Sequence, residues 1–128
     1  MNALSEQEIR YRLLKILSQE RDISQRRMAR EMGISLGKVN YCVSALIRQG
    51  LLKVHRFQAS RNKIRYIYLL TPSGIEEKAR LAVDFLKTKL REHEEIKRQI
   101  RELLLETDQE NLPDGLEEAD SELMKGAS

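Results

Sequence analysis

The chain has 128 residues, of which 34% are charged and 5% are aromatic, so it can form one domain with a modest apolar core and an appendage. It has no run of roughly 18 apolar residues that could span a membrane, and no apolar segment near Met1 of the kind found in secretory signals. A single cysteine and two distant histidines exclude an intrachain disulfide and the usual type of zinc site, and no catalytic motif is recognisable. We therefore expect a cytoplasmic protein that is not an enzyme, needs no metal or cofactor, and does not bind membranes.

The net charge of +3 conceals an uneven distribution of charge along the chain. Residues 1–105 contain 22 basic and 12 acidic residues, whereas residues 106–128 contain one basic and eight acidic residues. From Met32 to Ile75 there are seven lysines and arginines and no acidic residue. A basic body with an acidic tail is an asymmetry that indicates a nucleic-acid partner.

The first predicted helix covers residues 6–19. Ser5 and Glu8 have the spacing of a capping box, in which each side chain bonds the backbone N–H of the other. The apolar residues that follow recur at helical spacing and predict one buried face. They are Ile9, Leu13, Leu14, Ile16 and Leu17.

Residues 24–49 predict two helices joined by a tight turn. Ser24 and Ser35 are the residue types that begin helices, and Gly33 and Gly50 are typical of residues that end them. Ala29 is small enough to let the two helices approach closely. This layout is that of a helix-turn-helix unit.

Residues 51–70 change to the alternating pattern of β-strands. A polar segment at 58–63, which contains Arg61, Asn62 and Lys63, separates two such runs. The pattern predicts a hairpin that stands beside the helix-turn-helix unit as a wing.

Thr71 and Pro72 begin a long helix that we expect to reach about residue 105. Its apolar residues follow an imperfect heptad pattern, and its length of roughly 50 Å is more than a domain of some 70 residues can cover. We therefore predict that it pairs with a second copy of itself in a homodimer. The residues expected in the dimer contact are Leu86, Leu90, His93, Ile96, Ile100 and Leu103.

Two segments carry a resemblance to a known family: SQRRMAREMGISLGKVNYCVSALIRQGLL at residues 24–52 and YLLTPSGIEEKARL at residues 68–81. Together with the wing they resemble the small MarR-type winged-helix transcriptional regulators, most closely the short members associated with bacterial exopolysaccharide gene clusters. The likeness extends over about residues 8–100. It implies a dimeric regulator, most often a repressor, with a recognition helix at residues 35–49 in the major groove and a wing tip at residues 56–63 on the minor groove or backbone.

The expected fold class is therefore mainly α with a small β wing (α+β): a winged helix-turn-helix followed by a long C-terminal dimerisation helix. The domains are a winged helix-turn-helix unit at residues 1–70, the dimerisation helix at 71–106 and an acidic, disordered tail at 107–128. The expected partners are double-stranded DNA and a second copy of the chain. A small-molecule effector is compatible with the sequence, but no residue pattern supports one.

Side chains that lie off the apolar face of the recognition helix are the candidates for base contacts, and basic residues nearby are the candidates for phosphate contacts. On the recognition helix the candidates are Ser35, Gly37, Lys38, Asn40, Tyr41 and Ser44, with Ser35 serving mainly as a cap. On the preceding helix, two of the three residues Arg26, Arg27 and Arg30 are expected to face phosphates. On the wing the candidates are Arg56, Arg61, Asn62 and Lys63.

Two other functions are compatible with this fold. A winged-helix protein can act as an adaptor that binds another protein, because fold does not determine function. An RNA-binding protein would stack unpaired bases on aromatic residues, here Tyr66 and Tyr68. The acid-free stretch from Met32 to Ile75 favours DNA, because an adaptor has no reason to exclude acidic residues there.

Overall fold

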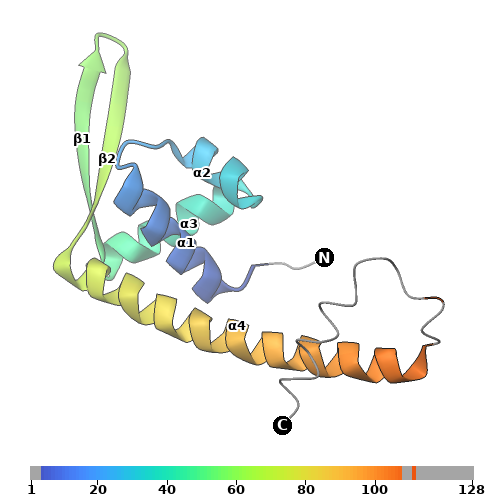
Figure 1. The fold of residues 1–128 in the computed structure, drawn as a ribbon. Coiled ribbons are helices and arrows are strands. Elements are labelled where there is room, and N and C mark those ends of the chain that lie inside the picture. The colour runs from blue at the N-terminus through green and yellow to red at the C-terminus, as the bar shows by residue number, and fades with distance from the viewer. Residues whose placement is uncertain (1–3, 108–110, 112–128) are drawn as a thin grey trace. The chain divides into compact units, whose positions relative to one another are not determined.

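The computed structural model describes residues 4–107 and 111, which form four helices and one two-stranded antiparallel sheet (Figure 1). The elements are α1 (Glu6–Gln19), α2 (Gln25–Met32), α3 (Leu36–Arg48), β1 (Leu52–Ser60), β2 (Lys63–Leu70) and α4 (Pro72–Glu106). The chain divides into two compact units at Phe85 and Leu86, within α4. The mainly α fold with a hairpin wing and a long C-terminal helix is as predicted. The predicted acidic tail, apart from residues 107 and 111, lies outside the described residues.

Each of the first three helices begins after a serine whose hydroxyl oxygen accepts a hydrogen bond from a backbone N–H three residues later. The three pairs are Ser5 with Glu8, Ser24 with Arg27, and Ser35 with Lys38, each with an N–O distance of 3.1 Å. A cap of this kind typically contributes about 1 kcal/mol, because it satisfies a donor that the helix itself cannot pair. These bonds confirm the three predicted helix starts.

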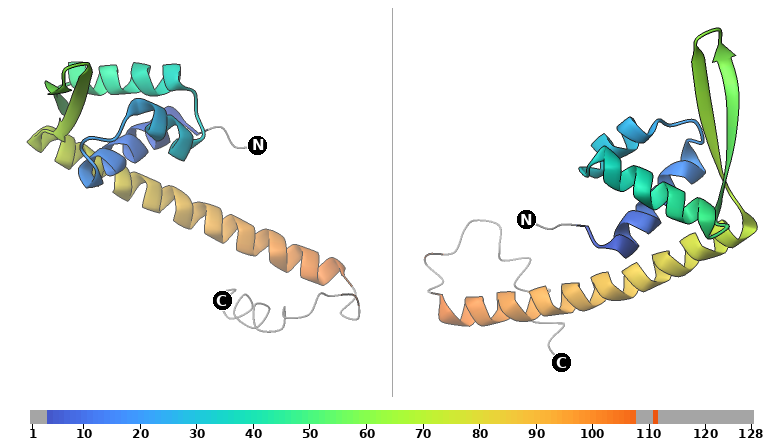
Figure 2. Two further views of the ribbon diagram at one scale, coloured as in Figure 1. Left: turned by 90° about the horizontal axis from the view of Figure 1, so that it is seen from above. Right: turned by 180° about the vertical axis from the view of Figure 1, so that it is seen from behind.

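The turn between α2 and α3 depends on Gly33, which has a left-handed φ of 67°. The backbone N–H of Ile34 donates to the carbonyl oxygen of Ala29 at 3.1 Å and so closes the end of α2. Ala29 is buried, and its small side chain lets α2 and α3 lie side by side, as the views in Figure 2 show. The helix-turn-helix geometry therefore follows from one glycine, one small residue and two caps.

The core of the first unit consists of side chains from α1, α2, α3, both strands and the first part of α4. Fully burying a leucine, methionine or valine contributes about 1.5–3 kcal/mol, so this cluster determines which face of α3 points inward. Its most deeply buried members are Leu13, Leu14, Leu17, Met28, Val39, Val43, Leu46, Leu52 and Leu81.

The hairpin is longer than the sequence predicts, and this corrects the expected wing tip at residues 56–63. Arg56 is paired with Tyr66 in the sheet, and Gln58 with Ile64, so only Arg61 and residue 62 are left for the turn. Both faces of the outer hairpin are exposed. Polar side chains therefore stay in water there and lose no hydration free energy. The pairing of the two strands continues through a segment whose polarity is typical of a loop.

The start of α4 is fixed by Thr71. Its hydroxyl oxygen accepts from the backbone N–H of Gly74 at 3.0 Å and its O–H donates to the carbonyl oxygen of Gly50 at 2.6 Å. Its backbone N–H donates to the carbonyl oxygen of Leu51 at 3.1 Å. The predicted helix start at Thr71 and Pro72 is confirmed, and the end of α3 is tied to the beginning of α4.

The second unit contains the part of α4 from Leu86 onward, which carries a face of exposed apolar side chains. Leu86, Leu90, Ile96 and Leu103 are each more than half exposed, whereas Ile100 is half-buried. The rest of this part of the helix is lined by ion pairs three and four residues apart, such as those of Arg98 with two glutamates. None of the helices in the described part of the chain is long and apolar enough to cross a bilayer.

Candidate nucleic-acid interface

The exposed face of α3 is determined by its buried face. Val39, Val43 and Leu46 point into the core. The opposite side of the helix presents residues spaced four, three and four apart, which therefore form one row along the helix surface. We call these residues the α3 row: Gly37, Tyr41, Ser44 and Arg48. Tyr41 has 60% of its surface exposed.

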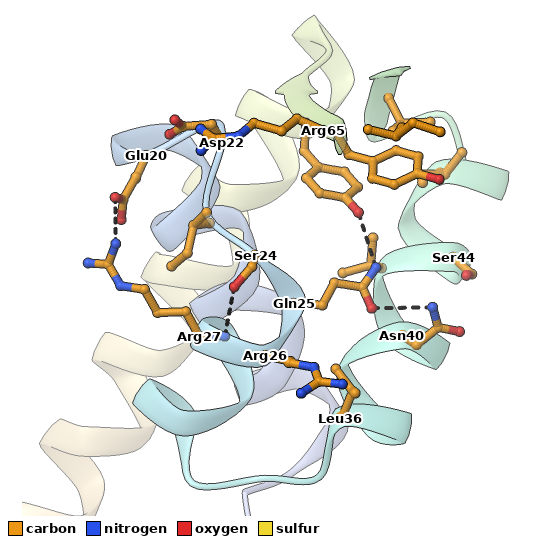
Figure 3. Close-up of a pocket in the computed structure, with 17 residues that line it drawn as sticks. Glu20, Asp22, Ser24, Gln25, Arg26, Arg27, Leu36, Asn40, Ser44 and Arg65 are labelled. Carbon is orange, nitrogen blue, oxygen red and sulfur yellow. Dashed lines mark hydrogen bonds and ion pairs between the residues drawn. The ribbon is translucent and has the colours of Figure 1, made fainter. Parts of the chain in front are cut away.

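Two of the predicted base-contacting residues lie on opposite flanks of this row rather than in it. Lys38 lies toward α1, with its Nζ atom 3.7 Å from a carboxylate oxygen of Glu6 and 5.6 Å from the centre of the Tyr41 ring. Asn40 lies toward α2, where its Nδ2 atom donates to the Oε1 atom of Gln25 at 3.2 Å (Figure 3). The predicted set is thus brought to one side of the molecule, but it forms a broad surface and not a single line.

The arginines of α2 differ in how well their charges are balanced. Arg27 forms ion pairs with Glu20 at 2.7 Å and with Glu31 at 3.2 Å. The hydrogen bond that Arg27 donates to Glu20, followed by the negative charge of Glu20, raises the pKa of Arg27 above its ordinary value. Arg26 and Arg30 are exposed and form no ion pair with any residue in the described part of the chain. Of the three, these two therefore carry charges that no described carboxylate balances.

The tip of the hairpin gathers basic side chains with no acidic residue beside them. Arg61 and Asn62 form the turn, and Lys63 begins β2. The side-chain amide of Gln58 donates to the carbonyl oxygen of Arg61 at 3.3 Å and stiffens the turn. Arg56, although placed in the strand, lines the same shallow hollow at the tip. The four predicted wing residues therefore lie together.

A cleft of about 900 Å³ lies between the helix-turn-helix unit and the hairpin (Figure 3). Its walls are the start of α2, one flank of α3 and strand β2, and its lining is partly apolar and partly polar. Arg26 and Arg65 line it, together with Glu20 and Asp22 of the segment around the end of α1. The apolar lining residues are Ile23, Leu36, Val43, Ile47, Val54 and Ile64, together with the rings of Tyr66 and Tyr68.

Three residues of this surface are missing from the sequence prediction. Arg48 lies four residues after Ser44, so helical spacing alone could have found it. Arg65 belongs to the acid-free stretch, but most of its neighbours in the strand are apolar, so no cluster of basic residues pointed to it. Gln25 contributes through its contacts with two other elements, and no sequence pattern reveals such contacts.

The aromatic residues considered for RNA stacking are not equivalent. Tyr68 is 6% exposed and its ring is part of the core, so it cannot stack on a base. Tyr66 is exposed on the hairpin. Of these two residues only Tyr66 is exposed, so the pair does not form an RNA-binding surface of the kind that stacks several bases.

Comparison with protein families finds a match for the helical part of this surface. Residues 6–53 match the family model described as winged helix-turn-helix DNA-binding. The match covers α1, α2, α3 and the first two residues of β1. No curated protein matches the chain at a significant level.

Solved structures share the fold. The PcaV transcriptional regulator from Streptomyces coelicolor is 24% identical with a TM-score of 0.56, and the match covers 75% of each chain. ZitR from Lactococcus lactis, solved in complex with DNA, is 18% identical with a TM-score of 0.54, over 98% of this chain and 73% of ZitR. ZitR is also described as a zinc-responsive MarR family member. Among the described residues, no three His, Cys, Asp or Glu side chains come together as metal ligands.

Proposed function

We propose that this chain is a DNA-binding transcriptional regulator of the MarR type. It binds its operator as a homodimer, with α3 in the major groove and the hairpin on the adjacent minor groove or backbone. The observation that carries the proposal is the surface formed by α3 and the hairpin. This surface is exposed, belongs to the acid-free stretch from Met32 to Ile75, and carries all seven basic residues of that stretch. A strongly basic surface on a winged helix is the electrostatic footprint of a DNA-binding protein.

The dimensions of α3 suit the major groove. Its 13 residues span about 20 Å, and a major groove about 12 Å wide admits one α-helix. The α3 row faces the base edges in this arrangement, with Lys38 and Asn40 on its two flanks. Arg48, the last residue of the helix, is our candidate in this row for a phosphate contact.

The hairpin supplies the second contact. Arg61 and Lys63 at its tip carry the charges that a narrow, A·T-rich minor groove attracts. The pairing of β1 with β2 holds the tip away from the helices, and the hydrogen bond from Gln58 holds its turn. Arg26 and Arg30 of α2 bind the backbone beside the major groove.

The homodimer is formed by the exposed apolar face of α4. Leu86, Leu90, Ile96 and Leu103 would leave a row of apolar side chains in water if this helix had no partner. Large exposed apolar patches mark interaction sites, and an identical helix has the same heptad spacing. A two-fold dimer predicts an operator with two half-sites about one helical turn apart.

We propose further that the regulator acts as a repressor and that its targets include exopolysaccharide genes. The support is the resemblance of residues 24–52 and 68–81 to the short regulators of such gene clusters. Recovery of the bound DNA from a genome-wide pull-down tests this assignment. Enrichment of unrelated promoters would contradict the assignment to exopolysaccharide genes and leave DNA binding itself intact.

The test of DNA recognition is the paired substitution Lys38→Ala and Asn40→Ala. We expect it to abolish specific binding in a mobility-shift assay while the fold and the dimer survive, because neither side chain belongs to the core. The control is Lys15→Ala with Gln19→Ala, which removes one charge and one amide from the exposed side of α1. Unchanged affinity of the first variant for the operator would refute the assignment of α3.

A further inference from the structure

We propose that Tyr68 and Gln25 orient Asn40 and thereby determine which base this residue selects. The inference rests on the proposed function, because it concerns how α3 discriminates between sequences. Asn40 is then the specificity-determining residue, and Tyr68 and Gln25 are positioning residues that do not touch DNA.

The three side chains form a continuous hydrogen-bonded chain, of which Gln25 and Asn40 are labelled in Figure 3. The Nε2 atom of Gln25 donates to the hydroxyl oxygen of Tyr68 at 3.1 Å. The Nδ2 atom of Asn40 donates to the Oε1 atom of Gln25 at 3.2 Å. These bonds link strand β2, the first turn of α2 and the exposed flank of α3, which are far apart in the sequence.

The first member of this chain is held rigidly. Tyr68 is buried, and its backbone N–H donates to the carbonyl oxygen of Arg21 at 2.9 Å, so both its ring and its backbone are fixed. Gln25 is the first residue of α2, directly after the Ser24 cap, and its side chain is half-buried. Neither side chain can leave without breaking contacts with a second element, so Asn40 is attached to a rigid support.

The direction of the two bonds determines which atom Asn40 offers to the groove. In the structure Gln25 uses its nitrogen for Tyr68, so its oxygen faces α3 and receives the Asn40 donor. Asn40 therefore turns its nitrogen toward Gln25, which leaves its Oδ1 atom free as an acceptor. In the major groove an acceptor selects the amino group of adenine or cytosine and disfavours the O6 and N7 atoms of guanine.

Without this support the amide of Asn40 could rotate and offer either end. An asparagine that can present a donor or an acceptor tolerates more bases, because each orientation fits a different edge. The chain therefore contributes to discrimination between bases more than to total affinity. A supporting shell of this kind is what keeps a recognition residue in one geometry.

The experiment is the substitution Tyr68→Phe in the full chain, which removes the hydroxyl group and keeps the ring. Selection from operators randomised at each position should show a weaker base preference at one position per half-site. The ratio of affinities for the preferred base and the other bases should fall by about tenfold there. Affinity for nonspecific DNA should remain unchanged. The control is Tyr11→Phe, at a half-buried tyrosine of α1 that lies outside the proposed interface and whose hydroxyl forms no hydrogen bond with a described residue. Its base preference should equal that of the unmodified chain.

A double-mutant comparison separates positioning from a general structural effect. In a chain that already carries Asn40→Ala, Tyr68→Phe should cause no further loss of discrimination. Gln25→Met, which removes both hydrogen bonds, should relax the same operator position and gives a second test if Tyr68→Phe does not fold. Equal losses with and without Asn40, or a uniform loss on all sequences, would overturn the inference. An unmodified chain that binds no DNA specifically would instead refute the proposed function.

Discussion

The carbonyl oxygen of Leu51 lies where a β-carbon on Gly74 would have to stand. The contact belongs to the junction at which Thr71 ties the end of α3 to the start of α4. Position 74 therefore requires glycine because of close approach of two backbone segments, not because of an unusual backbone conformation.

Gly74→Ala should destabilise the protein. Its methyl group would overlap a backbone oxygen that cannot rotate away, and overpacking of this kind costs about 1–3 kcal/mol. Urea denaturation should show a lower midpoint for this variant. Gly37→Ala is the matched control, because nothing lies within 4 Å of a β-carbon built there. Equal midpoints for the two variants would contradict the close contact.

The salt dependence of DNA binding should distinguish arginines that touch phosphates from arginines that do not. Arg61→Ala should reduce the slope of log K against log salt concentration by about one unit, because one fewer counterion is released. Arg27→Ala should leave the slope unchanged, since Glu20 and Glu31 already balance its charge. The slopes can be measured by fluorescence anisotropy from low to moderate salt. A lower slope for Arg27→Ala than for Arg61→Ala would reverse the assignment.

Cys42 should behave as a buried core residue and not as a redox switch. It is 6% exposed, and burial raises the pKa of its thiol above the ordinary value, an effect that nearby Lys38 partly opposes. The folded state therefore retains the proton at a pH where the unfolded state loses it. The free energy of unfolding should accordingly fall as pH rises above about 8.5, the ordinary thiol pKa.

Thiol reagents provide the measurement for Cys42. At pH 8 the folded chain should react slowly with a disulfide reagent, and the chain unfolded in urea should react quickly. Cys42→Ala should remove the alkaline loss of stability. Fast labelling of the folded chain would show that the thiol is accessible and would contradict the assignment of Cys42 to the core.

The dimer should depend on the apolar face of α4. Leu86→Glu combined with Ile100→Glu should yield monomers in analytical ultracentrifugation, because two carboxylates would meet at each contact. Thr88→Glu combined with Gln99→Glu adds the same charge outside that face and should leave the dimer intact. A dimer that survives the first pair of substitutions would refute this contact.

Most of the fold was predictable because its determinants are local. Ser5, Ser24 and Ser35 each bond a donor three residues away, and Gly33 needs only its own left-handed φ. Such signals lie within one turn of the chain and can be read directly from the residue types. The length of the hairpin was not predictable. Its outer residues are paired through backbone hydrogen bonds, and such pairing does not require a particular type of side chain.

The interface was predictable only in outline. Helical spacing identifies which residues of α3 avoid the core, but it does not show that Lys38 and Asn40 lie on opposite flanks toward different helices. The two carboxylates that balance Arg27 come from the end of α1 and from α2 itself. The bond between Gln25 and Tyr68 joins residues 43 positions apart, and only the folded chain brings them together.

Methylation interference on an operator recovered from genomic DNA tests the central claim, recognition of the major groove by α3, most directly. We predict that methylation of purines in the major groove blocks binding in two half-sites about one helical turn apart. The chain with Lys38→Ala and Asn40→Ala should lose this pattern. Binding that is indifferent to major-groove methylation, or an unmodified chain that binds all sequences equally, would contradict the claim.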